Sequence, residues 1–434
     1  MKDKVQIHAS STLAESERKR IQRSASLWYS AGSMLLALQS LIMLVVLTRV
    51  CDVYVAGVFT IAFANANLFL NVGKFGVRKF QASDRRGQFM FREYRASRIA
   101  TCLAMIASAC AYIAYCSVTV GYSSEKTAVM VVMCVFKAVE AFEDVYTGAY
   151  QLEDRLDVGA RLLTLRAAVT VAVFAILTIA FGSLLPALIA TTIFTACFLA
   201  CQVFYVRKRY GMPRVSELRG PAVVARLLKE CVPVFIADFL LFYMGNAAKY
   251  AIDAIMDDAA QAYFGYISMP VFVVMLLASF IYTPMIGSLT DQWRSGDIRG
   301  FALRFLKLSG VAVALTLACD AVAFAIGIPV LNVLYNAQLE SYLIELLVLM
   351  TGGGFLALAT LATLGITIVR FQNILIPLYG ALAIGAFLVS NSGVSAFGIT
   401  GAAWAYFLTM LASAIVFAVA FAASIRLKSR SVSS

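Results

Sequence analysis

The chain has 434 residues, of which 61% are hydrophobic and 14% are charged, and its mean hydropathy is +0.84. A soluble domain carries roughly 25% charged residues, so this composition excludes that class and indicates a multi-pass membrane protein. The net charge of +12 therefore does not indicate binding to nucleic acid. The positions of the positive charges instead indicate which loops face the cytoplasm. The nine cysteines form no CxxC pair and His8 is the only histidine, so we expect no metal site and no cofactor.

Residues 1–26 are polar and basic. They lack the apolar core and cleavage site of a signal peptide, so we predict a basic cytoplasmic tail. Twelve apolar runs of spanning length follow. They lie near residues 27–49, 55–73, 99–118, 127–147, 164–182, 185–205, 231–250, 262–283, 308–328, 343–368, 372–390 and 400–424. The sequence thus predicts an all-α integral membrane protein with twelve transmembrane helices.

The positive charges alternate between loops in step with these spans. With the N-terminus inside, the inner segments carry 32 of the 36 Lys and Arg residues, and the outer segments hold only Arg49, Lys126 and Lys249. Cytoplasmic segments of membrane proteins are enriched in Lys and Arg. The charge pattern therefore supports the span count and places both termini in the cytoplasm.

Two six-helix lobes are indicated by the position of the longest basic insertions and by a weak internal repeat. The segment 52–61 (DVYVAGVFTI) is similar to 258–267 (DAAQAYFGYI), and each precedes or begins the second span of its half. The predicted organisation is a tail at 1–26, a first lobe at 27–206, a basic cytoplasmic linker at 207–229, a second lobe at 230–425 and a cytoplasmic tail at 426–434.

The seventh predicted span carries polar residues on one side only. At about 100° per residue, one face collects Asp238, Phe242, Gly245, Asn246, Lys249 and Asp253. Lipid cannot solvate such a face, so it must turn towards protein or water. Asp238 has no cation within four residues, so its partner must lie on another helix. Lys249 and Asp253 lie at the outer end. For Lys249, a functional role and simple extension of the side chain to the membrane interface are equally good interpretations.

A second polar face occurs on the fourth predicted span. It comprises Lys137, Glu140, Asp144, Thr147, Gly148 and Gln151. Lys137 lies ~15 Å from either interface at 1.5 Å per residue, where an unpaired charge costs ~2.5–3.5 kcal/mol. Two interpretations remain: the residues neutralise one another and only stabilise the bundle, or they line a polar cavity that binds or couples transport.

The second predicted span ends in a row of amides and a lysine, Asn67, Asn71 and Lys74. Such amides can bond neighbouring helices, or they can bind sugar hydroxyls and phosphate, and the sequence leaves both open. The chain has no GxxxxGK[ST] motif, no GxSxG motif and no outer loop large enough for a catalytic domain. We therefore expect a transporter and not an enzyme.

Four stretches resemble the polysaccharide, O-antigen and teichoic-acid flippase branch of the multidrug/oligosaccharidyl-lipid/polysaccharide (MOP) exporter superfamily. They are residues 47–84, 136–166, 246–284 and 398–406, and the second stretch (FKAVEAFEDVYTGAYQLEDRLDVGARLLTLR) is the most specific. The resemblance implies two lobes around a central cavity that opens alternately to each face of a bacterial inner membrane. It also implies transfer of undecaprenyl-pyrophosphate-linked oligosaccharide from the inner to the outer leaflet.

The resemblance assigns roles to the polar residues. The expected substrate-binding or cavity residues are Arg49, Asn67, Asn71, Lys74, Lys137, Asn246 and Lys249. The expected ion-coupling residues are Glu140, Asp144, Asp238 and Asp253, which would use an H⁺ or Na⁺ gradient. The expected partners are membrane lipids, the lipid-linked oligosaccharide and a glycan polymerase or ligase. The alternatives are an ion-coupled multidrug exporter of the same superfamily and, less favoured, an integral glycan polymerase or ligase.

Overall fold

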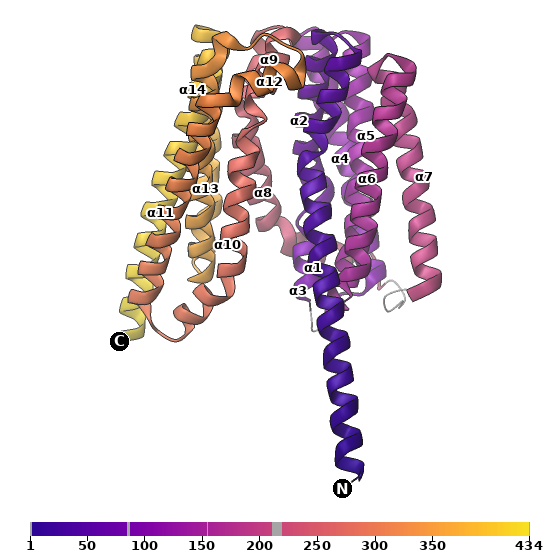
Figure 1. The fold of residues 1–434 in the computed structure, drawn as a ribbon, viewed down its shortest axis with the longest axis vertical. Helices are drawn as coiled ribbons and strands as arrows, with labels where there is room; N and C mark the ends of the chain where they lie inside the picture. The colour runs from indigo at the N-terminus through magenta and orange to yellow at the C-terminus, as the bar shows by residue number, and fades with distance from the viewer. Residues whose placement is uncertain (1, 85–86, 154, 211–218, 434) are drawn as a thin grey trace. The chain divides into compact units, whose positions relative to one another are not determined.

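The computed structural model describes residues 2–84, 87–153, 155–210 and 219–433. These residues form helices and no β-strand, which confirms the predicted all-α class (Figure 1). Part of the predicted linker, 211–218, and the terminal residues 1 and 434 of the predicted tails lie outside the described residues.

The chain divides into two compact units. The first comprises residues 1–51 and 65–235, and the second comprises residues 52–64 and 236–434. Two helices, α2 (Val53–Lys74) and α8 (Pro221–Ile255), therefore contribute residues to both units.

Seven helices run in order through the first part of the chain. They are α1 (Lys2–Val50), α2, α3 (Val77–Ser83), α4 (Phe91–Thr119), α5 (Ser124–Leu152), α6 (Leu156–Phe181) and α7 (Leu184–Tyr210). Within the first unit α5 packs against α3, α4, α6 and α7, while α1 packs along α6. The central place of α5 is what brings side chains from several helices to its polar face.

The second part of the chain follows α8. Its helices are α9 (Asp258–Ser268), α10 (Val271–Arg294), α11 (Ile298–Val322), a π-helical turn at Ala323–Gly327, α12 (Ile328–Tyr335), α13 (Leu343–Ile368) and α14 (Leu375–Ser433), with short 3₁₀ turns at Glu340–Tyr342 and Gln372–Ile374. Here α13 is central, because it packs against α10, α11 and α14. The short helices α9 and α12 pack together near one end of this unit (Figure 1).

Local sequence signals explain several helix ends. The Ser123 side chain caps α5 by accepting a hydrogen bond from the Lys126 amide at 3.1 Å. Asp257 caps α9 in the same way through the amide of Ala260 at 2.8 Å. Gly182, with φ of 61°, terminates α6 in the left-handed conformation that glycine adopts without strain. Polar caps and a glycine thus set these boundaries.

Among the described residues, nine stretches are long and apolar enough to cross a membrane. The stretch at Gln372–Leu427 contains the predicted eleventh and twelfth spans, and α14 departs from helical geometry between them at Gly398 (φ 58°, ψ −132°). The predicted fourth and seventh spans coincide with α5 and α8. These helices are not among the nine stretches, and both carry polar residues within the predicted span. The chain is a multi-pass membrane protein, and the count of twelve spans and the sides of the termini stay predictions.

The predicted eighth span, 262–283, is not one continuous helix. It is interrupted between α9 and α10 at Met269 and Pro270. Proline has no N–H to donate to the preceding turn, so a helix that continued through Pro270 would lose a hydrogen bond there. Pro270 instead stands directly before α10, where the missing donor costs nothing.

The two similar segments 52–61 and 258–267 pack closely within the second unit. A Cβ atom built on Gly57 would lie 1.8 Å from the carbonyl oxygen of Asp258, and one built on Gly265 would lie 2.7 Å from the Thr60 hydroxyl oxygen. Contacts this short admit only glycine. The glycine in each segment is therefore explained by the close approach of the two helices.

Candidate functional site

The polar face of α5 forms the most highly charged cluster that the structure describes in the first unit. Its three carboxylates are each paired with arginine or lysine. The pairs are Lys74–Glu140 at 2.8 Å, Lys137–Glu140 at 3.0 Å, Arg98–Asp144 at 3.0 Å, Arg78–Asp144 at 3.3 Å and Arg166–Glu143 at 2.6 Å. We call these eight residues the α5 charge cluster.

Glu140 joins two lysines at the middle of the cluster. One carboxylate oxygen accepts a hydrogen bond from Lys74 at the end of α2, and the other accepts one from Lys137 on α5 itself. Lys137 also donates to the amide oxygen of Gln39 on α1 at 3.0 Å. The Lys137–Glu140 pair predicted within one helix is thus present, but it is extended to two further helices.

Asp144 holds two arginines from different helices. Arg98 of α4 also donates to the carbonyl oxygen of Gly73 at 2.6 Å, and the Thr101 hydroxyl donates to the same oxygen at 2.8 Å. The last carbonyls of a helix lack intrahelical partners and attract cations. Arg98 therefore fixes the C-terminal end of α2 against α5, and this places Lys74 beside Glu140.

Arg166 of α6 and Glu143 form the most deeply buried pair. Each side chain is 1% exposed, and the Nε···Oε2 distance is 2.6 Å. A second nitrogen of Arg166 and the other oxygen of Glu143 are buried without a hydrogen-bond partner among the described residues. A buried pair of this kind is costly to break, because the remaining charge cannot reach water.

Exposure within the cluster is uneven, and the two most exposed side chains are both cations. The Lys74 side chain is 35% exposed and that of Arg78 is 19% exposed, whereas the carboxylate side chain of Glu140 is 9% exposed. Five cations meet three carboxylates, so the cluster carries two positive charges in excess. The part of it that a solute can reach is therefore cationic.

The structure brings together Lys74, Lys137, Glu140 and Asp144 of the residues predicted from sequence. Asn71, also predicted, instead donates to the carbonyl oxygens of Asn67 (3.0 Å) and Leu68 (3.4 Å) in its own helix. Arg49 is exposed at the end of α1, next to Val50.

The remaining predicted site residues lie on the part of α8 that belongs to the second unit. Asn246 donates to the Phe242 carbonyl oxygen of the same helix at 3.1 Å. Asp253 is buried, and Asp238 and Lys249 are half-buried. No hydrogen bond or ion pair joins Lys249 to any other residue that the structure describes.

Three cations of the cluster were not among the predicted site residues. Arg78, Arg98 and Arg166 were counted among the 32 inner Lys and Arg residues, although Arg166 also falls within the predicted span 164–182. In the structure α4 begins at Phe91 and α6 begins at Leu156, so Arg98 and Arg166 lie inside helices. The signal for Arg166 was the apolar sequence on each side of it, whereas Arg98 follows a polar stretch, 92–97, that gave no such signal.

Comparison with known proteins defines the fold. No protein-family model matches the chain, and no curated protein matches it in sequence. An inward-facing multidrug resistance MATE family transporter of the MOP superfamily matches with a TM-score of 0.65 and 12% identity, over 95% of this chain and 96% of the other. Its outward-facing counterpart matches with a TM-score of 0.63 and 12% identity, over 95% and 97%.

A mutant of the Vibrio cholerae MATE transporter VcmN is also similar, with a TM-score of 0.60 and 10% identity, over 95% of this chain and 98% of the other. The chain therefore has the fold of MATE transporters of the MOP superfamily. The predicted superfamily fold and multi-pass placement, consistent with a bacterial inner membrane, are supported. The polysaccharide-flippase branch is not, and the structures named here favour the multidrug alternative.

Proposed function

We propose that this chain is a transporter that moves its substrate across the membrane by alternating access, and that it is not an enzyme. The observation that carries the proposal is the match over nearly the whole chain to MATE transporter structures in inward-facing and in outward-facing conformations. A chain that shares its fold with both ends of such a cycle can use the same two states.

Two substrate classes are supported by different observations. Export of small organic molecules is supported by the matched structures, which are multidrug resistance transporters. Export of a lipid-linked oligosaccharide is supported by the α5 charge cluster, whose accessible members are Lys74 and Arg78 and whose excess charge is positive. Cations of this kind bind pyrophosphate strongly, and they repel the cationic compounds that many multidrug exporters carry.

Ion coupling is proposed for the acids on the polar face of α8. Glu140 and Asp144 of α5 each contact two cations, so their charge is already balanced by side chains. Asp253 is buried and Asp238 is half-buried on the α8 face, and they are our leading candidates to bind H⁺ or Na⁺ during the cycle. Cavity roles for Arg49, Asn67, Asn71, Asn246 and Lys249 stay proposals, as do contacts with a glycan polymerase or ligase.

The test uses proteoliposomes that contain the purified chain and an imposed pH gradient or potential. One set carries a lipid-linked oligosaccharide, whose transfer is followed by protection from added glycosidase, and another carries a fluorescent cationic dye. We expect oligosaccharide transfer, reduced at least tenfold in Lys74→Ala because a charge-assisted hydrogen bond contributes about 1.5–3 kcal/mol. Lys208→Ala is the matched control, since Lys208 is an exposed lysine at the end of α7.

The outcomes separate the candidates. Dye transport without oligosaccharide transfer would establish the multidrug alternative. Movement of neither substrate under any gradient would contradict the transport proposal itself.

A further inference from the structure

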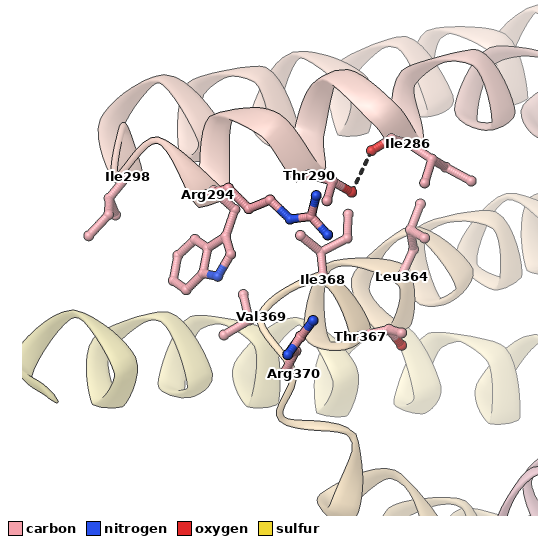
Figure 2. Close-up of a pocket in the computed structure, with 11 residues that line it drawn as sticks. Ile286, Thr290, Arg294, Ile298, Leu364, Thr367, Ile368, Val369 and Arg370 are labelled. Carbon is pink, nitrogen blue, oxygen red and sulfur yellow. Dashed lines mark hydrogen bonds between the residues drawn. The ribbon is translucent and has the colours of Figure 1, made fainter. Parts of the chain in front are cut away.

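A pocket lies at one end of the second unit, where α10, α11 and α13 approach one another (Figure 2). Its volume is about 660 Å³, within the range of roughly 300–1,000 Å³ that holds small ligands. It is lined by Ile286, Thr290, Trp293, Arg294, Gly296, Ile298, Leu364, Thr367, Ile368, Val369 and Arg370. None of these residues belongs to the α5 charge cluster or to the polar face of α8.

The walls of the pocket present a mainly apolar surface to a ligand. Ile286, Leu364 and Ile368 face it from α10 and α13 (Figure 2). The two threonine hydroxyls donate to their own helices, Thr290 to the Ile286 carbonyl at 2.8 Å and Thr367 to the carbonyl four residues earlier at 2.8 Å. Their hydrogens are therefore already used, and the surface offered to a ligand suits hydrocarbon.

Two arginines supply the only charges of the lining. Arg294 and Arg370 are exposed, and no ion pair or side-chain hydrogen bond joins either to another residue in the described part of the chain. Figure 2 shows the Arg294 guanidinium directed towards Ile368, with Arg370 on the α13 side of the pocket. An open pair of guanidinium groups beside an apolar wall matches a ligand that is anionic at one end and apolar at the other.

The backbone at Arg370 is a second, independent observation. α13 ends at Ile368, and the Phe371 amide donates back to the Ile366 carbonyl at 3.1 Å. Arg370 then adopts φ of 59°, the left-handed conformation that usually holds glycine at this position. A non-glycine residue is uncommon in this conformation, so the backbone singles out Arg370 independently of the pocket.

The surrounding sequence predicts that this pocket lies on the cytoplasmic side. Arg294 at the end of α10 and Arg299, Arg304 and Lys307 in α11 form a basic stretch, and basic segments next to spans lie in the cytoplasm. Trp293 lines the pocket, and tryptophan is enriched where membrane meets water. Basic pockets between helices on this side bind anionic lipid head groups.

We propose that this pocket binds an anionic glycerophospholipid of the cytoplasmic leaflet. Its phosphate lies between Arg294 and Arg370, and an acyl chain lies against Ile286, Leu364 and Ile368. The proposal does not depend on which substrate the chain transports, because the pocket shares no residue with the α5 charge cluster.

Native mass spectrometry of the purified full-length chain tests this with added phosphatidylglycerol or phosphatidylcholine. We expect preferential retention of phosphatidylglycerol. A basic residue near the surface strengthens binding about fivefold, so Arg294→Gln with Arg370→Gln should weaken it roughly 30-fold. Arg299→Gln is the matched control, an exposed arginine of α11 outside the pocket, and should leave binding unchanged.

A second measurement shows where the lipid binds and does not use the double variant. Phosphatidylglycerol with brominated acyl chains should quench Trp293 fluorescence more than brominated phosphatidylcholine does, and Trp293→Phe should remove this difference. Equal binding of both lipids, or a double variant that binds like the wild type, would overturn the proposal. Displacement of the lipid by millimolar inorganic phosphate alone would show a free-phosphate site instead.

Discussion

The helices α5 and α8 carry polar faces of the same width, yet their side chains are held in different ways. The α5 charge cluster joins α5 to α2, α3, α4 and α6 through four ion pairs, and a fifth lies within α5. On α8, Asn246 bonds its own helix and Lys249 has no partner among the described residues. One polar face is therefore fixed by its neighbours, and the lysine of the other remains able to bind something else.

This difference affects whether a charged residue in a membrane helix is interpreted as functional or as structural. A buried charge indicates function by default, but a paired cluster is also a structural device. Within the α5 charge cluster only Lys74 and Arg78 are accessible enough to meet a solute. Arg98 and Arg166, both buried, hold α4 and α6 to α5. The cluster thus combines a structural interior with a cationic edge.

The largest expected effect comes from breaking the interior of the α5 charge cluster. Arg166→Met leaves the Glu143 carboxylate buried without its cation, which should lower the free energy of unfolding by about 3–5 kcal/mol. Unfolding of the purified variant in mixed micelles measures this. Adding Glu143→Leu should recover most of the loss, because an apolar pair of similar volume replaces the ion pair.

A matched control is the exposed pair of Arg226 with Glu230, which are four residues apart on α8. Arg226→Met should change the free energy of unfolding by roughly 0.5 kcal/mol or less. An Arg166→Met protein as stable as this control would show that the cluster does not hold the first unit together.

A smaller effect is expected at two glycines, one on each polar face. A Cβ atom on Gly148 of α5 would lie 2.3 Å from the amide oxygen of Gln81, whereas one on Gly245 of α8 would meet nothing within 4 Å. Gly148→Ala should therefore destabilise by about 1–3 kcal/mol through overpacking. Gly245→Ala should stabilise by about 0.5–1 kcal/mol, because alanine is the better helix former.

Thermal unfolding of both variants in the same detergent gives this comparison directly. Destabilisation by Gly245→Ala as large as that of Gly148→Ala would mean that the α8 face is as tightly packed as the α5 face. The proposed contrast would then be wrong.

The sequence predicted the polar faces but not the way each is held. Helical periodicity alone puts Lys137, Glu140 and Asp144 on one side of α5, because that spacing follows from 3.6 residues per turn. The partners of these residues depend on which helices pack against α5, and local sequence carries no such information. Arg98 and Arg166 were for this reason counted with the cytoplasmic charges and not with the polar face of α5.

The smallest expected change in stability is at Lys249. A half-buried ammonium group without a partner gains nothing from its surroundings and loses hydration, while methionine keeps the length and apolar stem of the side chain. Lys249→Met should therefore leave the free energy of unfolding within about 0.5 kcal/mol of the wild type, or raise it. If Lys249 contacts the substrate, transport in proteoliposomes should fall in this variant although the protein is no less stable. A loss of stability above about 1 kcal/mol would instead show that Lys249 stabilises the second unit. Both polar faces would then be held by their neighbours, and the proposed contrast would be wrong.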